Sequence, residues 1–238
     1  MSDAKSYWNR VYRDAQLASS SPGDSVLIDA LDYFGGDITN CRLLDIGCGL
    51  GKASLCFAHH GASVTSIDTS AEAVKYLRTY CTERRITNIT PLQMSAADVA
   101  EIGPFDFVFG SFILHHIEPF DEFARTLRAT LQPGGRAFFY ENSAMSSLLM
   151  WARKRLTGRL GIPKHGDEEE YPLAPDEVDI LHKYFHTEVV YPELVFFRLI
   201  PLYLLRNKGG PLFSKLDDLF YRVPRFRRYS YRQYILLS

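Results

Sequence analysis

The sequence has few of the features that mark secreted, metal-binding or membrane-spanning chains. Only four of its 238 residues are cysteines: Cys41, Cys48, Cys56 and Cys81. They form no CxxC pair and lack the companion histidine spacing of a zinc site, so we expect no metal and free thiols in a reducing compartment. No apolar run approaches the roughly 20 residues that a membrane span needs. The first residues, MSDAKSYWNR, have no apolar signal core, so we expect a cytoplasmic location.

An excess of charge of one sign is also missing. The formal net charge is −1, which gives the whole chain no attraction to nucleic acid. Hydrophobic residues make up 46% and charged residues 23%, as in ordinary globular proteins. The length suits one large α/β domain.

Apolar strands alternate with amphipathic stretches along the first part of the chain. Strands are expected at 42–46, 63–67, 89–94, 105–109 and 136–140. Helices are expected at 5–16, 24–35, 53–60, 70–84 and 121–131. Ser70 is the expected N-cap of the fourth helix. This alternation predicts βαβ units, and therefore an α/β fold with a mostly parallel, doubly wound sheet.

The pattern changes after Glu141. The later segments are expected to be 145–156 (helix), 157–171 (polar loop), 175–185 (helix), 187–197 (strand-rich), 200–221 (apolar with basic interruptions) and 229–237 (final strand). We interpret residues 1–238 as a single domain. Its core is 1–142, and the cap and substrate-side elements at 143–228 are inserted before the final strand.

The most informative segment is a glycine loop between the first strand and its helix. Residues 43–51 read LLDIGCGLG, with alternating glycines at Gly47, Gly49 and Gly51. Glycine lets the backbone turn tightly and approach a ligand closely. The helix that follows offers free N–H donors at its first turn. Taken alone, the loop fits several nucleotide-type ligands.

Three neighbouring residues narrow the choice of ligand. Lys52 stands where a dinucleotide-binding GxGxxG motif carries its third glycine. Asp45 would be awkward beside a pyrophosphate but suits a ligand with an amino group and a sulfonium. Asp68 ends the second strand, at the spacing where a carboxylate accepts ribose hydroxyls. Either acid alone is equally well explained as a helix cap or turn residue, so the inference rests on their conjunction with the glycines.

With these residues and further motifs, the chain resembles the class I S-adenosylmethionine-dependent methyltransferases, particularly those acting on small molecules and quinones. The resemblance is good over about residues 7–142. The matching motifs occur in the family's order: DIGCGLG at 45–51, Asp68, FDFV at 105–108, LHHI at 114–117 and LQPGG at 131–135. It implies a Rossmann-like, seven-stranded sheet with helices on both faces and a helical cap, and S-adenosylmethionine as cofactor.

The resemblance also implies cofactor contacts. Where the family usually has an Asp that contacts the adenine amino group, this chain has Ser95, with Asp98 three residues further on. An aromatic N-terminal element that includes Tyr12 resembles one that closes over the cofactor in relatives, and Tyr12 and Phe112 are candidates to surround the sulfonium. The expected cofactor-binding residues are Tyr12, Asp45, Gly47, Cys48, Gly49, Gly51, Asp68, Thr69, Ser95, Ala96, Gly110, Ser111 and Phe112.

Methyl transfer from a sulfonium is an in-line displacement, so positioning of the acceptor supplies most of the catalysis. An oxygen or carbon acceptor with a high pKa also needs a base. His115, His116 and Glu141 are the catalytic candidates, because they follow strands at the carboxyl edge of the sheet. In the competing interpretation one histidine packs beneath its loop and the other contacts the methionine moiety, and Glu141 and Asn142 are only polar loop residues.

The C-terminal third is expected to select the acceptor. Leu148–Trp151 and Leu194–Leu205 are apolar, and basic residues interleave with them: Arg153, Lys154, Arg155, Arg159, Arg222, Arg225, Arg227, Arg228 and Arg232. We expect a small hydrophobic or amphiphilic acceptor, methylated at oxygen, with peripheral membrane contact as a further option. The simpler alternative is core packing with a solvated basic face. The sequence has no NPPY-like tetrad and no Pro-Cys nucleophile, which argues against nucleic-acid substrates.

Two other functions share part of this evidence. An NAD(P)-dependent oxidoreductase would use the glycine loop and Asp68, but Asp45 and the position of Gly51 disfavour it, as do the LHH and PGG turns. A methyltransferase-like binding protein without catalysis is left open by Ser95 at the adenine side. Titration with S-adenosylhomocysteine and with NADH would separate these functions.

Overall fold

The computed structural model describes residues 25–156, 171–204 and 209–238. The helix expected at 5–16, with Tyr12, and most of the expected polar loop therefore lie outside the described residues.

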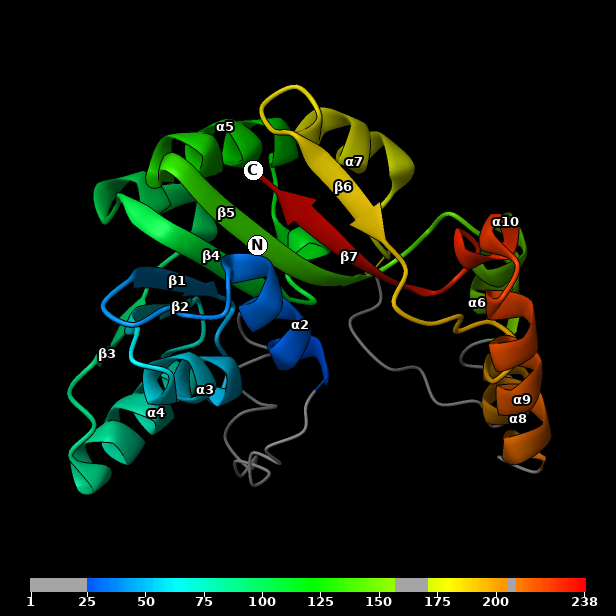
Figure 1. Ribbon diagram of the computed structural model, residues 1–238, viewed down its shortest axis with the longest axis horizontal. Coiled ribbons are helices and arrows are strands. Elements are labelled where there is room, and N and C mark those ends of the chain that lie inside the picture. Colours follow the sequence, from blue (N-terminus) through cyan, green and yellow to red (C-terminus); the bar gives the residue numbers. More distant parts are fainter. Residues whose placement is uncertain (1–24, 157–170, 205–208) are drawn as a thin grey trace.

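The centre of the molecule is a seven-stranded sheet with the order β3-β2-β1-β4-β5-β7-β6 (Figure 1). Its strands are β1 Arg42–Ile46, β2 Ser63–Asp68, β3 Ile89–Gln93, β4 Phe105–Ser111, β5 Leu131–Asn142, β6 Thr187–Val190 and β7 Arg232–Leu237. The strands from β3 to β5 pair in parallel, whereas β7 is antiparallel to both β5 and β6. The predicted doubly wound, mostly parallel sheet is confirmed.

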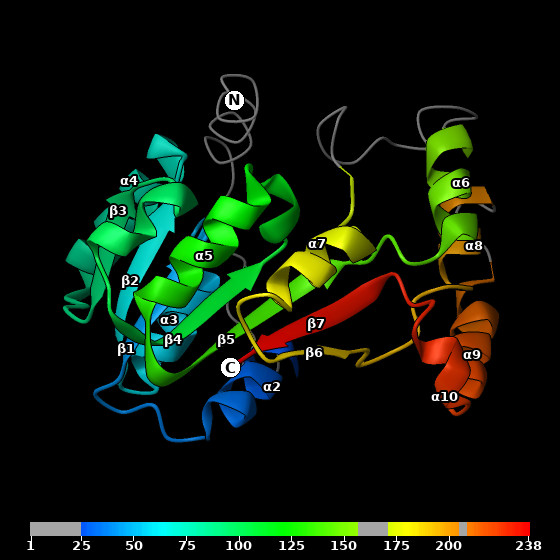
Figure 2. The same ribbon diagram turned by 90° about the horizontal axis from the view of Figure 1, so that it is seen from above.

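Helices cover both faces of this sheet. Figure 1 shows α5 and α7 above it and α2, α3 and α4 below it, and Figure 2 shows α5 and α7 from their own side. Their bounds are α2 Ser25–Phe34, α3 Lys52–His59, α4 Ala71–Arg84, α5 Phe120–Thr130 and α7 Pro175–Leu181. The side chain of Ser70 accepts a hydrogen bond from the amide of Ala73, which confirms it as the cap of α4.

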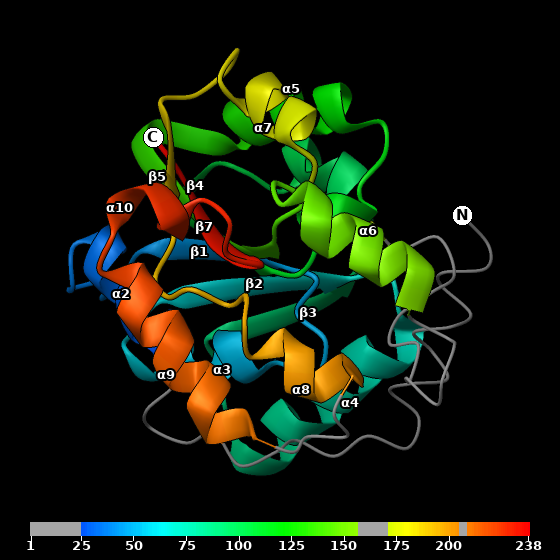
Figure 3. The same ribbon diagram turned by 90° about the vertical axis from the view of Figure 1, so that its right-hand side faces the viewer.

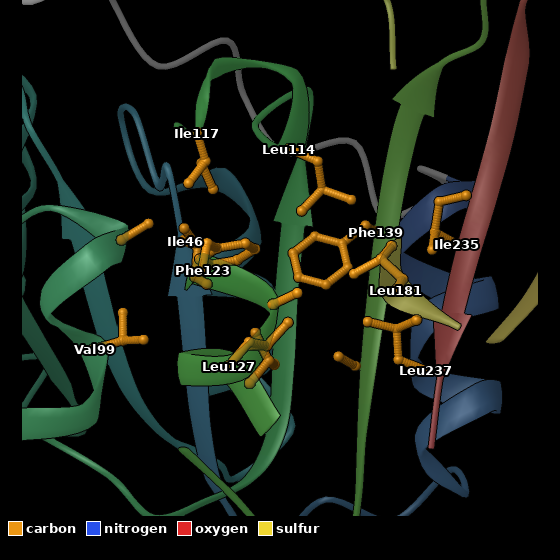
Figure 4. Packing of buried hydrophobic residues seen from close by; sticks show 14 of the residues in the cluster. Ile46, Val99, Leu114, Ile117, Phe123, Leu127, Phe139, Leu181, Ile235 and Leu237 are labelled. Carbon is orange, nitrogen blue, oxygen red and sulfur yellow. The ribbon is translucent and has the colours of Figure 1, made fainter. Parts of the chain in front are cut away.

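The period of the strands divides the core into two layers, because successive side chains point to opposite faces of a sheet. Leu43 and Phe138 pack towards α2, α3 and α4, whereas Leu44 and Phe139 pack with α5 and α7. Figure 4 shows Phe139 among Leu114, Leu181 and Ile235 in the second layer. Full burial of a side chain of this size stabilises the fold by about 1.5–3 kcal/mol.

Four further helices form a group beyond the sheet: α6 Ser147–Leu156, α8 Leu199–Leu204, α9 Gly210–Tyr221 and α10 Pro224–Arg227. They lie together past the ends towards which β5 and β6 run, and Figure 3 shows them in front of the sheet. Met150 of α6 packs with Val195 and Tyr231 in a small apolar cluster. This cluster attaches α6 to the chain that enters β7.

Asp217 joins α9 to the segment before α8. The side chain is fully buried and accepts hydrogen bonds from the amides of Phe196, Phe197 and Arg198 at 3.2, 2.8 and 3.1 Å. Nε of Arg198 donates to the same carboxylate at 2.8 Å. A buried carboxylate with this many donors is well compensated for its lost hydration, so it fixes α9 against residues 196–198.

The later part of the chain differs in detail from the expectation. The strand-rich segment 187–197 is a strand only to Val190, and the apolar segment 200–221 is divided between α8 and α9. The block 143–228 also contributes α7 and β6 to the sheet layers, because Leu181 and Phe185 pack into the main core. Of the helices in the described residues, α6, α8, α9 and α10 stand apart from the sheet. Among the described residues, no helix is long and apolar enough to cross a membrane.

Candidate active site

The glycine loop connects β1 to α3 at the carboxyl edge of the sheet, beside the point where the strand order reverses. The amides of Gly47 and Cys48 both donate to the carbonyl of Ile67, at 2.9 and 3.0 Å. Gly47 and Gly51 have φ values of +70° and +90°, which side chains other than glycine rarely adopt. Ligands of doubly wound sheets bind at this switch point, so the loop has the expected location.

Gly47 and Gly51 also lack room for a side chain. A methyl group on Gly47 would lie 2.8 Å from Cδ1 of Ile113, and one on Gly51 would overlap Cδ1 of Leu77. Close packing of the loop against these two residues holds its backbone in place. The amides of Gly47, Cys48, Gly49 and Gly51 also donate within the protein, so these hydrogen bonds fix the path of the loop backbone.

Asp68 connects the end of β2 to this loop. Its two carboxylate oxygens accept hydrogen bonds from the amide of Gly49 at 2.9 Å and from that of Ser70 at 2.8 Å. The pKa of Asp68 is raised because burial outweighs these stabilising hydrogen bonds. The predicted ribose-binding acid is therefore adjacent to the glycine loop, at the same edge of the sheet.

Asp45 lies beneath the loop and not at its rim. It is 2% exposed, and its carboxylate accepts a hydrogen bond from Oγ of Ser54, whose Oγ in turn accepts from Ser66. Burial raises the pKa of Asp45 to about 7. The chain of hydroxyls ties β1 and β2 to α3, and contact of Asp45 with a ligand's amino group remains a prediction.

The adenine side of the expected site is formed by the segment after β3. Ser95 caps the short 3₁₀ helix η1 Ala96–Glu101 by accepting a hydrogen bond from the amide of Ala97 at 3.2 Å. Asp98 is exposed on this helix, and Thr69 is exposed at the end of β2. Ser95 and Thr69 thus lie at the same edge as Asp68, where their contact with a cofactor remains a prediction.

A tight turn follows β4. A methyl group on Gly110 would lie 2.7 Å from both Cγ2 of Ile113 and Cδ1 of Phe139, so only glycine fits there. Phe112 has a φ of +54°, and its amide donates to the carbonyl of Tyr140 at 2.8 Å. A positive φ in a bulky residue stores strain and occurs often at functional sites. The turn directs the chain from Ser111 into the LHH segment.

The three predicted catalytic residues are brought together behind this turn. Glu141 is fully buried, and its Oε1 accepts from the amides of Ile113 and Leu114, both at 2.7 Å. Its Oε2 lies 2.7 Å from Nδ1 of His115, and the His115 and His116 rings are 4.2 Å apart. Glu141 therefore fixes the 3₁₀ helix η2 Leu114–His116 and orients His115.

The geometry also brings together residues that the sequence did not single out as one site. Arg232 begins β7 and pairs with Asn142 at the end of β5, so both lie at the carboxyl edge. The guanidinium carbon of Arg232 lies over the rings of Phe112, Tyr140 and Tyr231. The order of strands could not be deduced from the alternation of residues 229–237, so Arg232 was counted only among the basic residues of the C-terminal third.

The fold resembles those of solved structures of other proteins. The magnesium protoporphyrin IX methyltransferase from Synechocystis PCC 6803, solved with bound S-adenosylhomocysteine, gives a TM-score of 0.61 at 18% identity, covering 98% of this chain and 92% of that one. The YcgJ protein from Bacillus subtilis gives 0.61 at 15% identity, covering 90% and 97%. At such identities the likeness concerns the fold.

Similarity in sequence to curated proteins covers less than half of the chain in the following two relatives. The ubiquinone biosynthesis O-methyltransferase of Xanthomonas oryzae pv. oryzae (strain PXO99A) is 36% identical over 112 residues, which cover 45% of this chain and 46% of the relative. That of Caulobacter sp. (strain K31) is 36% identical over 95 residues, covering 40% and 38%. The match thus spans less than half the length of these relatives.

The fold, the glycine loop with Asp68 and these matches make the core of the chain similar to class I S-adenosylmethionine-dependent methyltransferases. Residues 43–135 match the family model of the methyltransferase domain. The matched span begins in β1 and ends at Gly135 in β5, so it contains the glycine loop, Asp68 and the LHH segment.

Proposed function

We propose that the protein transfers a methyl group from S-adenosylmethionine to an oxygen of a small hydrophobic or amphiphilic acceptor. The observation that carries this proposal is the glycine loop, where the amide of Gly49 donates a hydrogen bond to the carboxylate of Asp68 at 2.9 Å. Both residues lie inside the segment that matches the methyltransferase domain. The choice of oxygen is supported by the curated relatives, which are named O-methyltransferases.

The residues at the carboxyl edge fit such a cofactor. Asp68 supplies a carboxylate for ribose hydroxyls, and the loop backbone at Gly47 and Gly51 leaves no room for a Cβ beside Ile113 and Leu77. Bound S-adenosylmethionine supplies an electrophilic methyl group on a sulfonium. The expected contacts of Cys48, Ser95, Ala96, Ser111 and Tyr12 belong to this proposal.

His115 is the proposed base for the acceptor hydroxyl. Nδ1 of His115 faces Oε2 of Glu141 at 2.7 Å, so the carboxylate orients the ring, and Nε2 is the atom proposed to take the acceptor's proton. The side chains of His115 and Glu141 are 1% and 0% exposed, so a proton held there is shielded from bulk water. Glu141 acts through His115, so it is a positioning residue in this proposal. His116 is the alternative base.

The cofactor part of the proposal predicts selective binding. Calorimetric titration is expected to give a micromolar Kd for S-adenosylhomocysteine, on the order of −8 kcal/mol, and no measurable binding of NADH. Incubation with a labelled methyl donor and a metabolite library is expected to label a small acceptor. Binding of NADH without binding of S-adenosylhomocysteine would contradict the proposal.

The helices α6, α8, α9 and α10 are the proposed acceptor cap. Large apolar side chains are exposed on α6 and just before it. The exposed fraction is 42% for Met145, 59% for Leu148 and 57% for Trp151. Basic residues follow in the last turn of α6. Apolar surface beside positive charge suits contact with an anionic membrane surface, from which a cytoplasmic enzyme would take an amphiphilic acceptor.

This membrane contact predicts sedimentation with vesicles that contain anionic lipid. The Leu148→Asp/Trp151→Asp variant is expected to reduce the bound fraction several-fold, because two apolar contacts are lost and negative charge is added. Ile28→Asp is the matched control, since Ile28 is 48% exposed on α2, away from the cap. Equal sedimentation of the cap variant and the wild type would show that these helices do not contact the lipid.

A further inference from the structure

Arg232 occupies a distinctive position at the carboxyl edge. It is the first residue of β7 and lies opposite Asn142, the last residue of β5. Its side chain is half-buried, and Nη1 donates to Oδ1 of Asn142. The guanidinium is thereby held on the strand-end side of the sheet, where the acceptor must approach.

Three aromatic rings surround this guanidinium. Its carbon lies 4.6 Å from the ring centroid of Phe112, 5.5 Å from that of Tyr140 and 5.8 Å from that of Tyr231. Phe112 and Tyr140 also contact each other, with centroids 4.7 Å apart. Aromatic faces attract a cation and restrict its hydration, so Arg232 is positioned and partly desolvated before any ligand binds.

No carboxylate of the described chain forms an ion pair with Arg232, although the cap contains such pairs. Arg198, by comparison, is paired with Glu193 at 2.7 Å and with Asp217 at 2.8 Å. A guanidinium has five N–H donors in a planar fork, and the bond to Asn142 uses one of them. The charge of Arg232 is therefore available to an anion from outside the chain.

The Arg232 guanidinium lies close to the turn that borders the glycine loop. Gly110 pairs with Ile46 in the sheet, so the turn that carries Phe112 lies next to the start of the glycine loop. Phe112 in turn packs beneath the Arg232 guanidinium. A second guanidinium, that of Arg153 on α6, donates to the hydroxyl of Tyr231 at 2.7 Å. The guanidinium groups of Arg153 and Arg232 thus both lie against Tyr231.

We propose that Arg232 binds a carboxylate of the acceptor, so that the substrate class is a hydroxylated aromatic acid. Such an acid would place its carboxylate on the guanidinium, bidentately where geometry permits, and its ring beside Phe112 and Tyr140. Arg232 is then a specificity-determining residue that discriminates the acid from its neutral amide. This inference rests on the proposed methyltransferase function.

The test compares 3,4-dihydroxybenzoate with 3,4-dihydroxybenzamide, titrated into protein saturated with S-adenosylhomocysteine. The wild type is expected to bind the acid about tenfold or more tightly than the amide, because a charge-assisted hydrogen bond is lost with the amide. Arg232→Gln is expected to remove this preference while leaving the affinity for S-adenosylhomocysteine and the melting temperature unchanged. Arg228→Gln is the matched control, because Arg228 stacks on Tyr229 at an exposed site.

Three results would overturn the proposal. The first is equal affinity of the wild type for acid and amide, which includes no binding of either up to about 10 mM. The second is an acid preference that survives in Arg232→Gln. The third is weaker S-adenosylhomocysteine binding in a normally folded Arg232→Gln variant. The last result would assign Arg232 to the methyl donor. Failure of wild-type protein to bind S-adenosylhomocysteine at all would instead refute the proposed function.

Discussion

Asp68→Ala is expected to weaken binding of S-adenosylhomocysteine at least tenfold while the protein stays folded. Loss of a carboxylate that accepts ribose hydroxyls costs roughly 1.5–3 kcal/mol, since hydrogen bonds to charged groups are strong. The variant also removes the acceptor for the Gly49 amide at 2.9 Å, which loosens the glycine loop itself. Both effects lower affinity, so calorimetric titration should show a loss at the upper end of this range.

A matched control distinguishes this effect from the general loss of a carboxylate. Asp106 lies at the opposite end of the same sheet, where it accepts a hydrogen bond from the amide of Arg42 at 2.7 Å. Asp106→Ala is expected to leave cofactor affinity unchanged. Asp68→Asn keeps one acceptor without the charge and should give an intermediate affinity. Unchanged affinity in a folded Asp68→Ala variant would show that Asp68 neither binds the ribose nor holds the loop in its ligand-binding form.

The parts of the fold that depend on local sequence could be predicted. A strand, three alternating glycines and a helix form a local unit, so β1, the glycine loop and α3 appear within one or two residues of the expected bounds. Ser70 was predictable as a cap for the same reason. By contrast, 187–197 was expected to be strand-rich throughout, but strand pairing is non-local, and the pairing of β6 with β7 ends at Val190 and Tyr234.

The candidate site also contains some residues that the local sequence could place and others that it could not. Asp68 was identified because its spacing from the loop is short and the motif is local. Arg232 could not be placed, because its partner Asn142 is 90 residues away and the two meet only when β7 inserts antiparallel between β5 and β6. Glu141 was expected near the acceptor from its position after the fifth strand. Its side chain is fully buried against His115 and the amides of Ile113 and Leu114, and contact of Glu141 with an acceptor stays a prediction.

Glu141 gives the largest expected effect on stability. Its carboxylate accepts from two backbone amides and faces Nδ1 of His115, all at 2.7 Å and without solvent contact. Glu141→Ala leaves these buried donors unsatisfied, so the free energy of unfolding should fall by about 3–5 kcal/mol. Urea denaturation measures this loss. A decrease below about 1 kcal/mol would mean that the turn 113–116 rearranges to find other acceptors.

Glu141→Gln separates the support of the turn from the orientation of His115. The amide oxygen of Gln can still accept from Ile113 and Leu114, so most of the stability should be retained. Its NH₂ group then faces Nδ1 of His115 and donates to it, which moves the ring proton to Nε2 and removes the lone pair that would accept the acceptor's proton. Methyl transfer at neutral pH is therefore expected to fall about 100-fold, within the range of general-base catalysis, with little change in S-adenosylhomocysteine affinity. The rate should recover as the pH rises and the acceptor hydroxyl ionises without help. If the folded variant keeps the wild-type rate and pH profile, His115 is not the base and the Glu141–His115 pair serves only to hold the turn beside the glycine loop.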